Sequence, residues 1–309
     1  MSEVLVTICI CTFRRPRLLE ELLRSLTGQL GVDFLWNIVV IDNDEEETAA
    51  KVVIDFCQSE RNIHIDYLVE RRQGISYARN SAVRNSNGEY IAFIDDDEIA
   101  SPGWLASLVN VAKATGADAV LGPVLPEYPP NTATWIKRTR FFDRPRYKTG
   151  EVLSANDGKT CNALLKRSIL NTDQVFDEKL AFTGSEDFEL FYRLKKFGRI
   201  FVWSDEAVVY EKVPLSRQKL SWMLERSLRP SIMYWRIVGK DASVIKRIAH
   251  AALGFWLGFP LVLLALMLFP FDRCFGFLLA RRGLLFLGRC FALTKIEMYG
   301  YQAKDVTSC

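Results

Sequence analysis

The chain alternates between short apolar runs and longer segments whose apolar residues recur at helical spacing. The apolar runs are rich in β-branched residues and lie at Val4–Ile10, Ile38–Ile41, Ile63–Val69, Tyr90–Ile94 and Ala119–Leu121. Strands that alternate with helices form βαβ units, which build a mainly parallel sheet. The pattern therefore predicts an α/β fold with a Rossmann-like sheet flanked by helices.

Two helices have clear sequence signals. After Pro16, apolar residues follow one helical stripe, at Leu18, Leu19, Leu22, Leu23 and Leu26. Charged residues occupy the opposite face, so this helix is predicted to pack against the sheet. A second helix is predicted to begin near Trp104, with Ser101 as its N-cap and Pro102 as its first residue. Residues 122–150, rich in Pro, Tyr, Trp and Arg, are too long for an ordinary connection, so we interpret them as a functional loop or lid beside the site.

Composition narrows the class of protein. With 309 residues and 49% hydrophobic composition, the chain can bury one large catalytic domain and an appendage. The net charge of +3 and the lack of a basic stripe interleaved with aromatic residues argue against nucleic acid as a partner. Seven cysteines without a CxxC pair indicate reduced thiols rather than disulfides or zinc ligands. The N-terminus has no basic region or cleavage site of a secretory signal, so the catalytic part is expected in the cytoplasm.

The strongest chemical signal is the acidic run Asp95, Asp96 and Asp97, which follows an apolar run. Ligands of open parallel sheets bind beyond the carboxyl ends of the strands, where this run is expected. Adjacent carboxylates repel one another, and Mg²⁺ or Mn²⁺ takes one or two of them while a substrate diphosphate supplies further oxygens. In an extended segment Asp95 and Asp97 would form the functional pair and Asp96 would point the other way. The alternative is a solvated acidic turn that caps the next helix.

Polar residues follow other predicted strands at the same edge of the sheet. Thr12 and Asp42 are placed to contact a nucleobase, although polar residues also end strands as turns and caps. A helix is predicted between Gly74 and Gly88, and its Arg79 is available for phosphate or carboxylate contacts.

Five segments occur in the order VTICICTFRRP, IVVIDND, GISYARNSA, NGEYIAFIDDDEIASPGWL and TGSEDFELFYRLKKFG. Together they resemble the motifs of glycosyltransferase family 2, whose members are inverting enzymes with a GT-A fold. The later stretch AVVYEKVPLSRQKLSWMLERSLRPS is similar to bacterial exopolysaccharide and cell-surface glycan transferases of the succinoglycan-assembly kind. The resemblance covers residues 4 to about 235. It implies a glycosyltransferase that uses a nucleotide-sugar donor, with UDP favoured by the resemblance alone.

The resemblance implies a role for each matching residue. Thr12 and Asp42 would hold the base, and Arg79 would lie close to the nucleotide. Asp95 would lie at the ribose and the metal, and its neighbour Asp96 is also expected to bind the nucleotide sugar.

The metal ligands implied by the resemblance are Asp97, which would bind the ion that bridges the diphosphate, and Asp95. Many GT-A enzymes have a metal-binding His after the catalytic base, whereas this chain has Tyr210, Glu211 and Lys212 there. Glu211 is the candidate for that role, and the third protein ligand stays open.

The catalytic base is assigned to the pair Glu186 and Asp187, on the resemblance and on a physical argument. Displacement at an anomeric carbon needs a carboxylate that takes the proton of the acceptor hydroxyl. Adjacent carboxylates in an apolar setting cannot both ionise freely, so the pKa of one should rise. They also open a predicted helix, Phe188–Phe197, so helix capping is the alternative. We interpret Asp187 as the base and Glu186 as the residue that orients the acceptor.

Two features bear on the reaction and its alternatives. No Q-x-x-R-W stretch follows the base, which favours addition of one sugar per encounter over processive synthesis. The alternative to an active enzyme is a catalytically silent GT-A-like membrane scaffold. A nucleotidyltransferase is a weaker alternative, because it would need a glycine loop near residue 12, where this chain has bulky and basic residues.

The C-terminal part indicates a membrane. Between Arg247 and Asp272 lie 24 residues without formal charge, enough to span a hydrocarbon core, and basic residues flank both ends. We expect a re-entrant hairpin kinked at Pro260, followed by an interfacial amphipathic helix over Phe275–Leu293; a buried helix of a soluble protein is the alternative. The predicted organisation is a GT-A domain (1–215), a helical connector (216–245) and membrane-associated helices (246–309). From this organisation we expect the enzyme to lie at the cytoplasmic face of the inner membrane and to use a lipid-linked glycan as its acceptor.

Overall fold

The structure, a computed structural model, describes residues 6–170 and 174–294. The chain forms two compact units. Unit 1 contains the described residues up to Glu127 and those from Asp143 to Lys212, and unit 2 contains Tyr128–Phe142 and the described residues from Val213 onward. The chain thus leaves unit 1 after Glu127 and re-enters it at Asp143. Val4 and Leu5, in the first predicted strand, and the last residues of the predicted 246–309 segment lie outside the described part.

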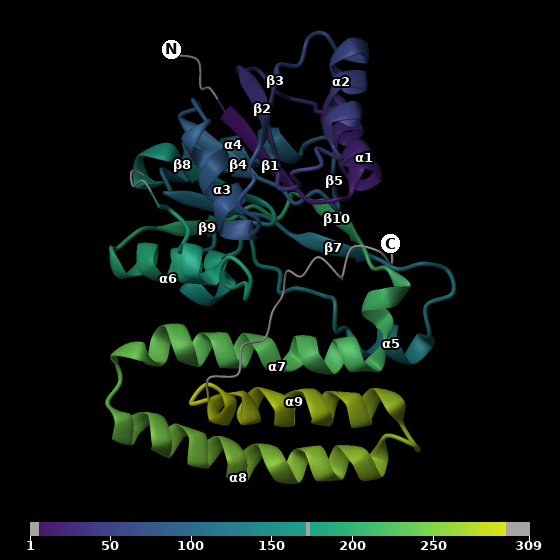
Figure 1. The fold of residues 1–309 in the computed structure, drawn as a ribbon, viewed down its shortest axis with the longest axis vertical. Coiled ribbons are helices and arrows are strands. Elements are labelled where there is room, and N and C mark those ends of the chain that lie inside the picture. Colours follow the sequence, from purple (N-terminus) through teal and green to yellow (C-terminus); the bar gives the residue numbers. More distant parts are fainter. Residues whose placement is uncertain (1–5, 171–173, 295–309) are drawn as a thin grey trace. The chain divides into compact units, whose positions relative to one another are not determined.

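Unit 1 is built on a seven-stranded sheet with the strand order β3-β2-β1-β4-β8-β6-β9 (Figure 1). Its strands are β1 (Val6–Thr12), β2 (Trp36–Asp42), β3 (Ile65–Val69), β4 (Tyr90–Phe93), β6 (Ala119–Leu121), β8 (Ala163–Lys166) and β9 (Phe201–Trp203). Strands β3, β2, β1 and β4 are parallel to one another, β9 is parallel to β6, and β8 is antiparallel to both β4 and β6. The predicted mainly parallel sheet is confirmed, with β8 as an antiparallel insertion.

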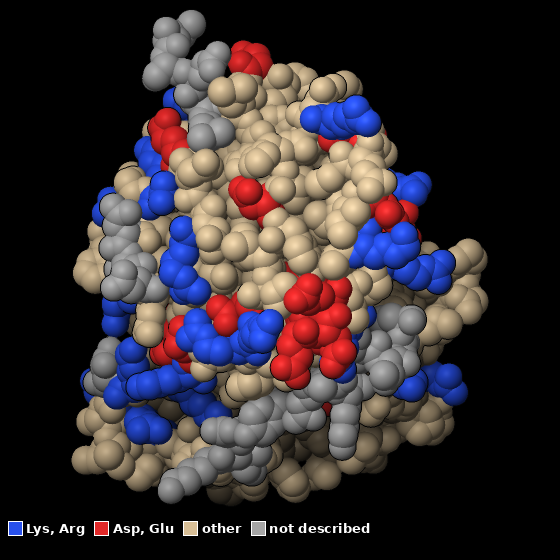
Figure 2. All heavy atoms as spheres, turned by 45° about the horizontal axis from the view of Figure 1, so that its top comes forward, with Lys and Arg blue, Asp and Glu red and all other residues tan. Residues whose placement is uncertain are grey.

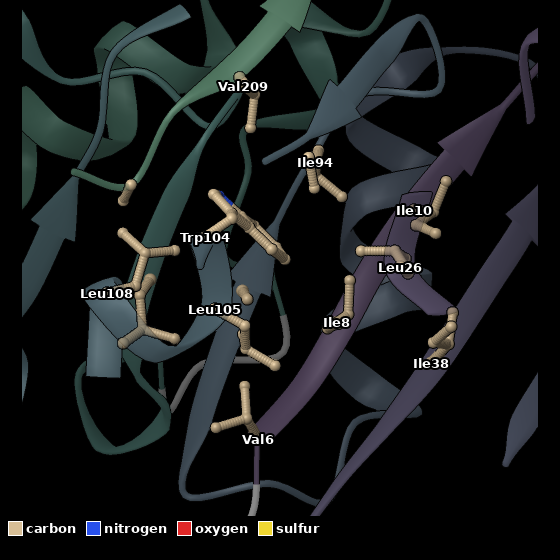
Figure 3. Packing of buried hydrophobic residues seen from close by; sticks show 14 of the residues in the cluster. Val6, Ile8, Ile10, Leu26, Ile38, Ile94, Trp104, Leu105, Leu108 and Val209 are labelled. Atoms are coloured by element: carbon tan, nitrogen blue, oxygen red, sulfur yellow. The ribbon is translucent and has the colours of Figure 1, made fainter. Parts of the chain in front are cut away.

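Helices cover both faces of this sheet. One core cluster joins the sheet to α1 (Pro16–Thr27), α2 (Ala50–Ser59) and α4 (Trp104–Thr115). The other joins it to α3 (Ile75–Arg84) and α6 (Glu186–Lys196). Four leucines of the predicted stripe in α1 are fully buried, at Leu19, Leu22, Leu23 and Leu26. Figure 3 shows Leu26 beside Ile8 and Ile10 of β1, and Trp104 and Leu105 of α4 over the same face. The result is a three-layer α/β/α unit.

A second sheet of three strands lies in unit 1, in the order β5-β10-β7. Its strands are β5 (Glu98–Ala100), β10 (Val209–Lys212) and β7 (Val124–Glu127). Strand β10 is antiparallel to β5 and parallel to β7. The register places Glu211 of β10 opposite Glu98 of β5, so this small sheet brings a second acidic group to the end of the acidic run.

Two sequence predictions about local structure are wrong. Helix α4 begins at Trp104 as expected, but its N-cap is Gly103 and not Ser101. The carbonyl of Ser101 instead accepts the Trp104 N–H at 3.0 Å, because Pro102 and Gly103 form a turn ahead of the helix. Residues 122–150 are not irregular throughout, since they contain β7 and the short helix α5 (Thr134–Thr139).

Unit 2 is a helical assembly in which α9 (Arg273–Phe291) lies between α7 (Leu220–Ile237) and α8 (Val244–Leu268) (Figure 1). Glycines permit the close approach of α8 and α9: a Cβ on Gly258 would lie 2.6 Å from the carbonyl oxygen of Gly283. On the other side of α9, the Ser231 hydroxyl donates to the carbonyl of Leu285 at 2.5 Å. The predicted connector 216–245 therefore contains α7, a packed part of unit 2.

Helix α8 continues through Pro260 without a break, so the re-entrant hairpin expected within residues 247–272 is wrong. A proline removes one backbone hydrogen bond and does not by itself end a helix as apolar as this one. With 25 residues and a mean hydropathy of 2.2 over its most apolar window, α8 is long and apolar enough to cross a membrane, and 22% of that window is buried. The second apolar helix predicted over Phe275–Leu293 exists as α9, starting two residues earlier.

The segment Tyr128–Phe142 belongs to unit 2 through an aromatic cluster. Phe141 packs edge-on against Phe277 of α9 with ring centroids 5.3 Å apart, and Phe142 stacks on Trp222 of α7 at 6.1 Å. The guanidinium of Arg281 lies 5.3 Å from the Phe141 ring. Residues far apart in the sequence are thereby held together by aromatic contacts.

Charges of both signs are interspersed on the face drawn in Figure 2, where several Asp and Glu side chains gather next to Lys and Arg side chains. The chain carries 40 basic and 37 acidic residues, so the net field is small. The electrostatics of the candidate site therefore depend on local pairs.

Candidate active site

The acidic run after β4 forms a turn. The Glu98 N–H donates to the carbonyl of Asp95 at 3.1 Å, and the Asp95 N–H donates to Oε2 of Glu98 at 3.0 Å. The expectation that Asp96 points away from its neighbours along an extended chain is therefore wrong, because side chains do not alternate in a turn. Asp95 contacts Arg79, whereas Asp96 and Asp97 both contact Arg15.

Asp96 is joined to the end of β1. Its Oδ2 accepts a hydrogen bond from the Thr12 hydroxyl at 2.8 Å, and its Oδ1 contacts Nη1 of Arg15 at 3.2 Å. The same guanidinium nitrogen lies 3.4 Å from Oδ2 of Asp97. Burial raises the pKa of Asp96 to about 7, against the lowering effect of Arg15. Thr12, Asp96 and Asp97 are thus brought together, with Arg15 as the shared cation.

Arg79 connects the acidic run to the predicted catalytic pair. It projects from α3, and its Nη2 lies 3.3 Å from Oδ1 of Asp95 while its Nη1 donates to Oε1 of Glu186. Helix α3 is positioned by Gly74, whose φ of +134° favours glycine and whose N–H donates to Oδ1 of Asn43 at 2.7 Å. Asp95, Arg79 and Glu186 therefore form one ion-pair chain across the site.

Glu186 and Asp187 open α6 as predicted, and the structure separates their environments. Glu186 is 1% exposed, and its Oε2 has no hydrogen-bond partner among the described residues. Burial raises the pKa of Glu186 to about 7, with Arg79 opposing and Asp187 adding to the shift. The Asp187 side chain is half-buried, so it can be reached from solvent. The expected rise of one pKa in the pair falls on Glu186.

Asp42 lies in a separate polar network at the end of β2. Its Oδ2 accepts from the Ala49 N–H and from the Tyr67 hydroxyl, each at 2.9 Å, and its Oδ1 accepts from the Asp44 N–H at 3.1 Å. The side chain is fully buried, and burial raises its pKa. Asp42 thus holds the loop that follows β2, and its contact with a nucleobase stays a prediction.

Glu211 meets the acidic run through an arginine. Its Oε2 lies 2.8 Å from Nη2 of Arg144, whose other terminal nitrogen contacts the thiol of Cys161. Burial raises the pKa of Cys161 to about 12, against the opposing charge of Arg144. Glu211 is therefore paired with a cation here, and its role as a metal ligand stays a prediction.

A divalent metal fits the residues of this cluster. Among the described residues, ligand atoms of Asp95, Glu98 and Cys161 lie within 4.8 Å of one another. Glu98 is 1% exposed, and its Oε1 has no hydrogen-bond partner within the described part of the chain. A buried carboxyl oxygen without a partner is costly and is satisfied by a cation.

A cavity of about 200 Å³ adjoins this cluster. Arg144 and Cys161 line it on the side of the acidic residues. Trp203 and Tyr147, whose rings meet edge to face at 5.4 Å, give it an aromatic wall, and Asn156 adds a polar group. An aromatic wall with a few nearby polar groups is typical of a pocket for a small molecule.

Four residues of the site were not found from the sequence: Arg15, Glu98, Arg144 and Cys161. Glu98 follows the acidic run directly and Arg15 lies in the motif at the end of β1, so both carried a usable signal. Arg144 and Cys161 had no such signal in the sequence. They lie 46 and 63 positions after Glu98, and only tertiary folding brings them close to it.

The sequence matches known families over most of its length. Residues 7–172 match glycosyl transferase family 2, and residues 90–293 match glycosyl transferase family group 2. The chain is 33% identical to the succinoglycan biosynthesis protein ExoM of Rhizobium meliloti over 98% of its own length and 97% of that protein. The chain belongs to glycosyl transferase family 2.

This family 2 glycosyltransferase has further relatives of known name. It is 24% identical to the GalNAc(5)-diNAcBac-PP-undecaprenol beta-1,3-glucosyltransferase of Campylobacter jejuni, over 59% of the chain and 57% of that protein. The mannosyltransferase PcManGT from Pyrobaculum calidifontis, solved with GDP-Man and Mn²⁺, shares the fold with a TM-score of 0.55 at 17% identity, over 93% of this chain and 73% of that one. The GT-A fold and the glycosyltransferase activity class are confirmed, as is the likeness to exopolysaccharide transferases.

Proposed function

We propose that the enzyme transfers a single sugar, with inversion, from a nucleotide-sugar donor, with a UDP-sugar favoured, to a lipid-linked glycan in exopolysaccharide assembly at the cytoplasmic face of the membrane. The observation that carries this proposal is the Asp95–Arg79–Glu186 chain, which joins the acidic run to a carboxylate pair at the start of a helix. The acidic run and Glu186, the sequence neighbour of the proposed base, therefore belong to one ion-pair network.

The proton-accepting group in this proposal is Asp187. Its half-buried carboxylate takes the proton of the acceptor hydroxyl as that oxygen attacks the anomeric carbon and the bond to the diphosphate breaks. Glu186, buried and held by Arg79, keeps the start of α6 in place and contributes to the orientation of the acceptor. One carboxylate is accessible and the other is fixed, which suits a base and its positioning residue.

The donor side uses the ends of β1, β2 and β4. In this proposal Thr12, Asp42 and Asp96 hold the nucleoside and Arg79 contacts the nucleotide; the Thr12–Asp96 and Arg79–Asp95 contacts support it. Asp95, with Asp97 and Glu211 nearby, would hold a divalent metal, Mn²⁺ or Mg²⁺, which neutralises charge on the leaving diphosphate when bound. The structure of PcManGT with Mn²⁺ supports a metal in this fold.

The decisive test of the proposal is turnover. Full-length enzyme is incubated with a panel of UDP-, GDP- and dTDP-sugars, with Mn²⁺ or Mg²⁺, and a polyprenyl diphosphate glycan as acceptor. We expect metal-dependent release of one nucleoside diphosphate for each sugar transferred. The anomeric configuration of the product should be inverted relative to the donor. If the protein binds a donor but forms no product with any combination of nucleotide sugar and metal, the catalytically silent scaffold is favoured.

A membrane role is supported by the exposed face of α8. Trp256 is 75% exposed, Leu266 68% and Met267 70%, and a run of such residues on one helix is a membrane-docking feature. The lipid-linked substrate in the name of the Campylobacter jejuni relative supports the same location. An enzyme held at the membrane meets a lipid-linked acceptor at high effective concentration.

We expect the double substitution Trp256→Glu and Leu266→Glu to abolish co-flotation with phospholipid vesicles. Each change removes about 2 kcal/mol of transfer free energy, so vesicle partition should fall by roughly tenfold or more per site. The matched control is Leu30→Glu, which alters a leucine that is 66% exposed on unit 1. Equal flotation of the α8 variant and this control would contradict membrane docking through α8.

A further inference from the structure

The acidic turn and a cysteine from another strand form a compact group of three potential ligands. Asp95 lies in the turn, Glu98 begins β5, and Cys161 lies two residues before β8. Their ligand atoms lie within 4.8 Å of one another. Two oxygens and one sulfur therefore face a common point from three segments of unit 1.

Glu98 gives an independent indication that this point holds a ligand. Its side chain is 1% exposed, and its Oε2 accepts from the Asp95 N–H, while Oε1 has no partner among the described residues. Buried polar atoms are normally satisfied. A carboxyl oxygen that is buried beside an aspartate and a thiol is suited to a cation.

Cys161 is held in place by its neighbour. Asn162 adopts a φ of +94°, and its side-chain amide donates to the carbonyls of Pro123 and Ala207 at 2.9 and 2.7 Å. Its Oδ1 accepts from the indole N–H of Trp104 at 2.8 Å. These bonds fix the backbone beside the thiol, and Cys161 also lines the 200 Å³ cavity, which gives an ion a route from solvent.

A positive charge already lies against the cysteine. The guanidinium of Arg144 contacts Sγ of Cys161 and Oε2 of Glu211. A metal that binds Sγ must displace this contact, and Arg144 keeps Glu211 as its partner. Arg144 is therefore a competitor whose removal should strengthen metal binding.

We propose that Asp95, Glu98 and Cys161 bind a divalent metal through two oxygens and one sulfur, so that this centre prefers the thiophilic ions Zn²⁺, Co²⁺ and Cd²⁺ to Mg²⁺. Thiolate ligands select such ions, whereas Mg²⁺ takes oxygen ligands in octahedral geometry. Bonds from Zn²⁺ to sulfur and oxygen are about 2.3 and 2.1 Å long, so the ligand atoms need to approach by roughly an ångström. The thiol proton passes to solvent as the metal–sulfur bond forms. The inference rests on the proposed function only in assigning the metal to the same edge of the sheet.

The test is a titration of the full-length, metal-free enzyme with Co²⁺ alone. We expect a sulfur-to-cobalt charge-transfer band in the near ultraviolet that saturates at one ion per chain. Zn²⁺ should abolish the band at stoichiometric concentration, whereas Mg²⁺ in large excess should leave it. Calorimetry in two buffers of different ionisation enthalpy should report proton release with Zn²⁺.

Variants assign the ligands. Cys161→Ser should lose the band and at least tenfold of the Zn²⁺ affinity, while Cys57→Ser, which changes an exposed cysteine, should keep both. Glu98→Gln should keep the band but weaken Co²⁺ binding, and Arg144→Gln should strengthen it. Thermal unfolding of each apo variant checks that it is folded.

Absence of the band in the wild type, or a band of full intensity in Cys161→Ser, would overturn the thiolate ligand. Sugar transfer with Mn²⁺ in such a case would leave the proposed function standing. Failure of transfer with a normal cobalt band would refute the proposed function and retain the metal centre. The two ideas are therefore separable by spectroscopy and turnover.

Discussion

Asp187→Asn is expected to lower turnover by roughly 10² to 10⁴ fold, the range for loss of a general base, while the affinity for nucleotide sugar stays near that of the wild type. Asp187 is half-buried at the start of α6, so solvent can reach it, and the amide has nearly the same shape as the carboxylate. The measurement is a side-by-side determination of donor affinity by calorimetry and of turnover at saturating substrates.

Glu186→Gln is the matched comparison. Glu186 is buried and bonded to Arg79, so the neutral amide should weaken this contact and produce a smaller loss of turnover than Asp187→Asn. If the larger loss belongs to Glu186→Gln, the base is the buried carboxylate. Near-normal turnover in Asp187→Asn with donor bound would require the single-displacement mechanism with this base to be abandoned.

Asp95→Ala is expected to remove metal-dependent nucleotide binding. Asp95 belongs to the ligand set implied by the family resemblance and to the cluster with Glu98 and Cys161, so its loss affects the ion in either arrangement. Removal of a direct ligand should lower metal affinity by more than the roughly 10 to 100 fold that follows loss of a residue hydrogen-bonded to a ligand. Titration of UDP in the presence of Mn²⁺, and again with chelator, measures the metal-dependent part.

Asp97→Ala distinguishes the two arrangements. Loss of metal-dependent affinity in this variant as well would place Asp97 at the ion, whereas a mild effect would limit it to its contact with Arg15. Asp55→Asn serves as a control, because Asp55 is an exposed acid that pairs with Lys51 on the surface of α2. Unchanged metal-dependent affinity in Asp95→Ala would remove the acidic run from the donor site.

The sequence predicts the frame of unit 1 well because its signals are local. Strands β1, β2, β3, β4 and β6 are short β-branched runs, and α1 has a complete apolar stripe, so hydrophobic spacing suffices to place them. Strand β8 was not predicted. Its four residues, ALLK, show no alternation of apolar and polar positions, since β8 is buried between β4 and β6 in the middle of the sheet.

The candidate site was predictable in its residue types and less so in its pairings. Acidic residues at strand ends and at the start of α6 gave Asp95 and Glu186, and the structure joins both to Arg79. The approach of Glu98 to Cys161 depends on the turn after β4 and on the register of β8 against β4, which no local sequence pattern specifies. The turn at the acidic run, which overturned the expected alternation, depends on one backbone hydrogen bond.

Within the described residues, the excursion of Tyr128–Phe142 into unit 2 means that the polypeptide passes between the two units three times. The C-terminal helices therefore cannot be removed by truncation without disturbing the packing of the internal segment Tyr128–Phe142. A chain shortened after Lys212 would keep Phe141 and Phe142 but lose the Phe277 and Trp222 rings that cover them. To exchange unit 2 between related enzymes, the internal segment Tyr128–Phe142 would have to be replaced together with the C-terminal helices.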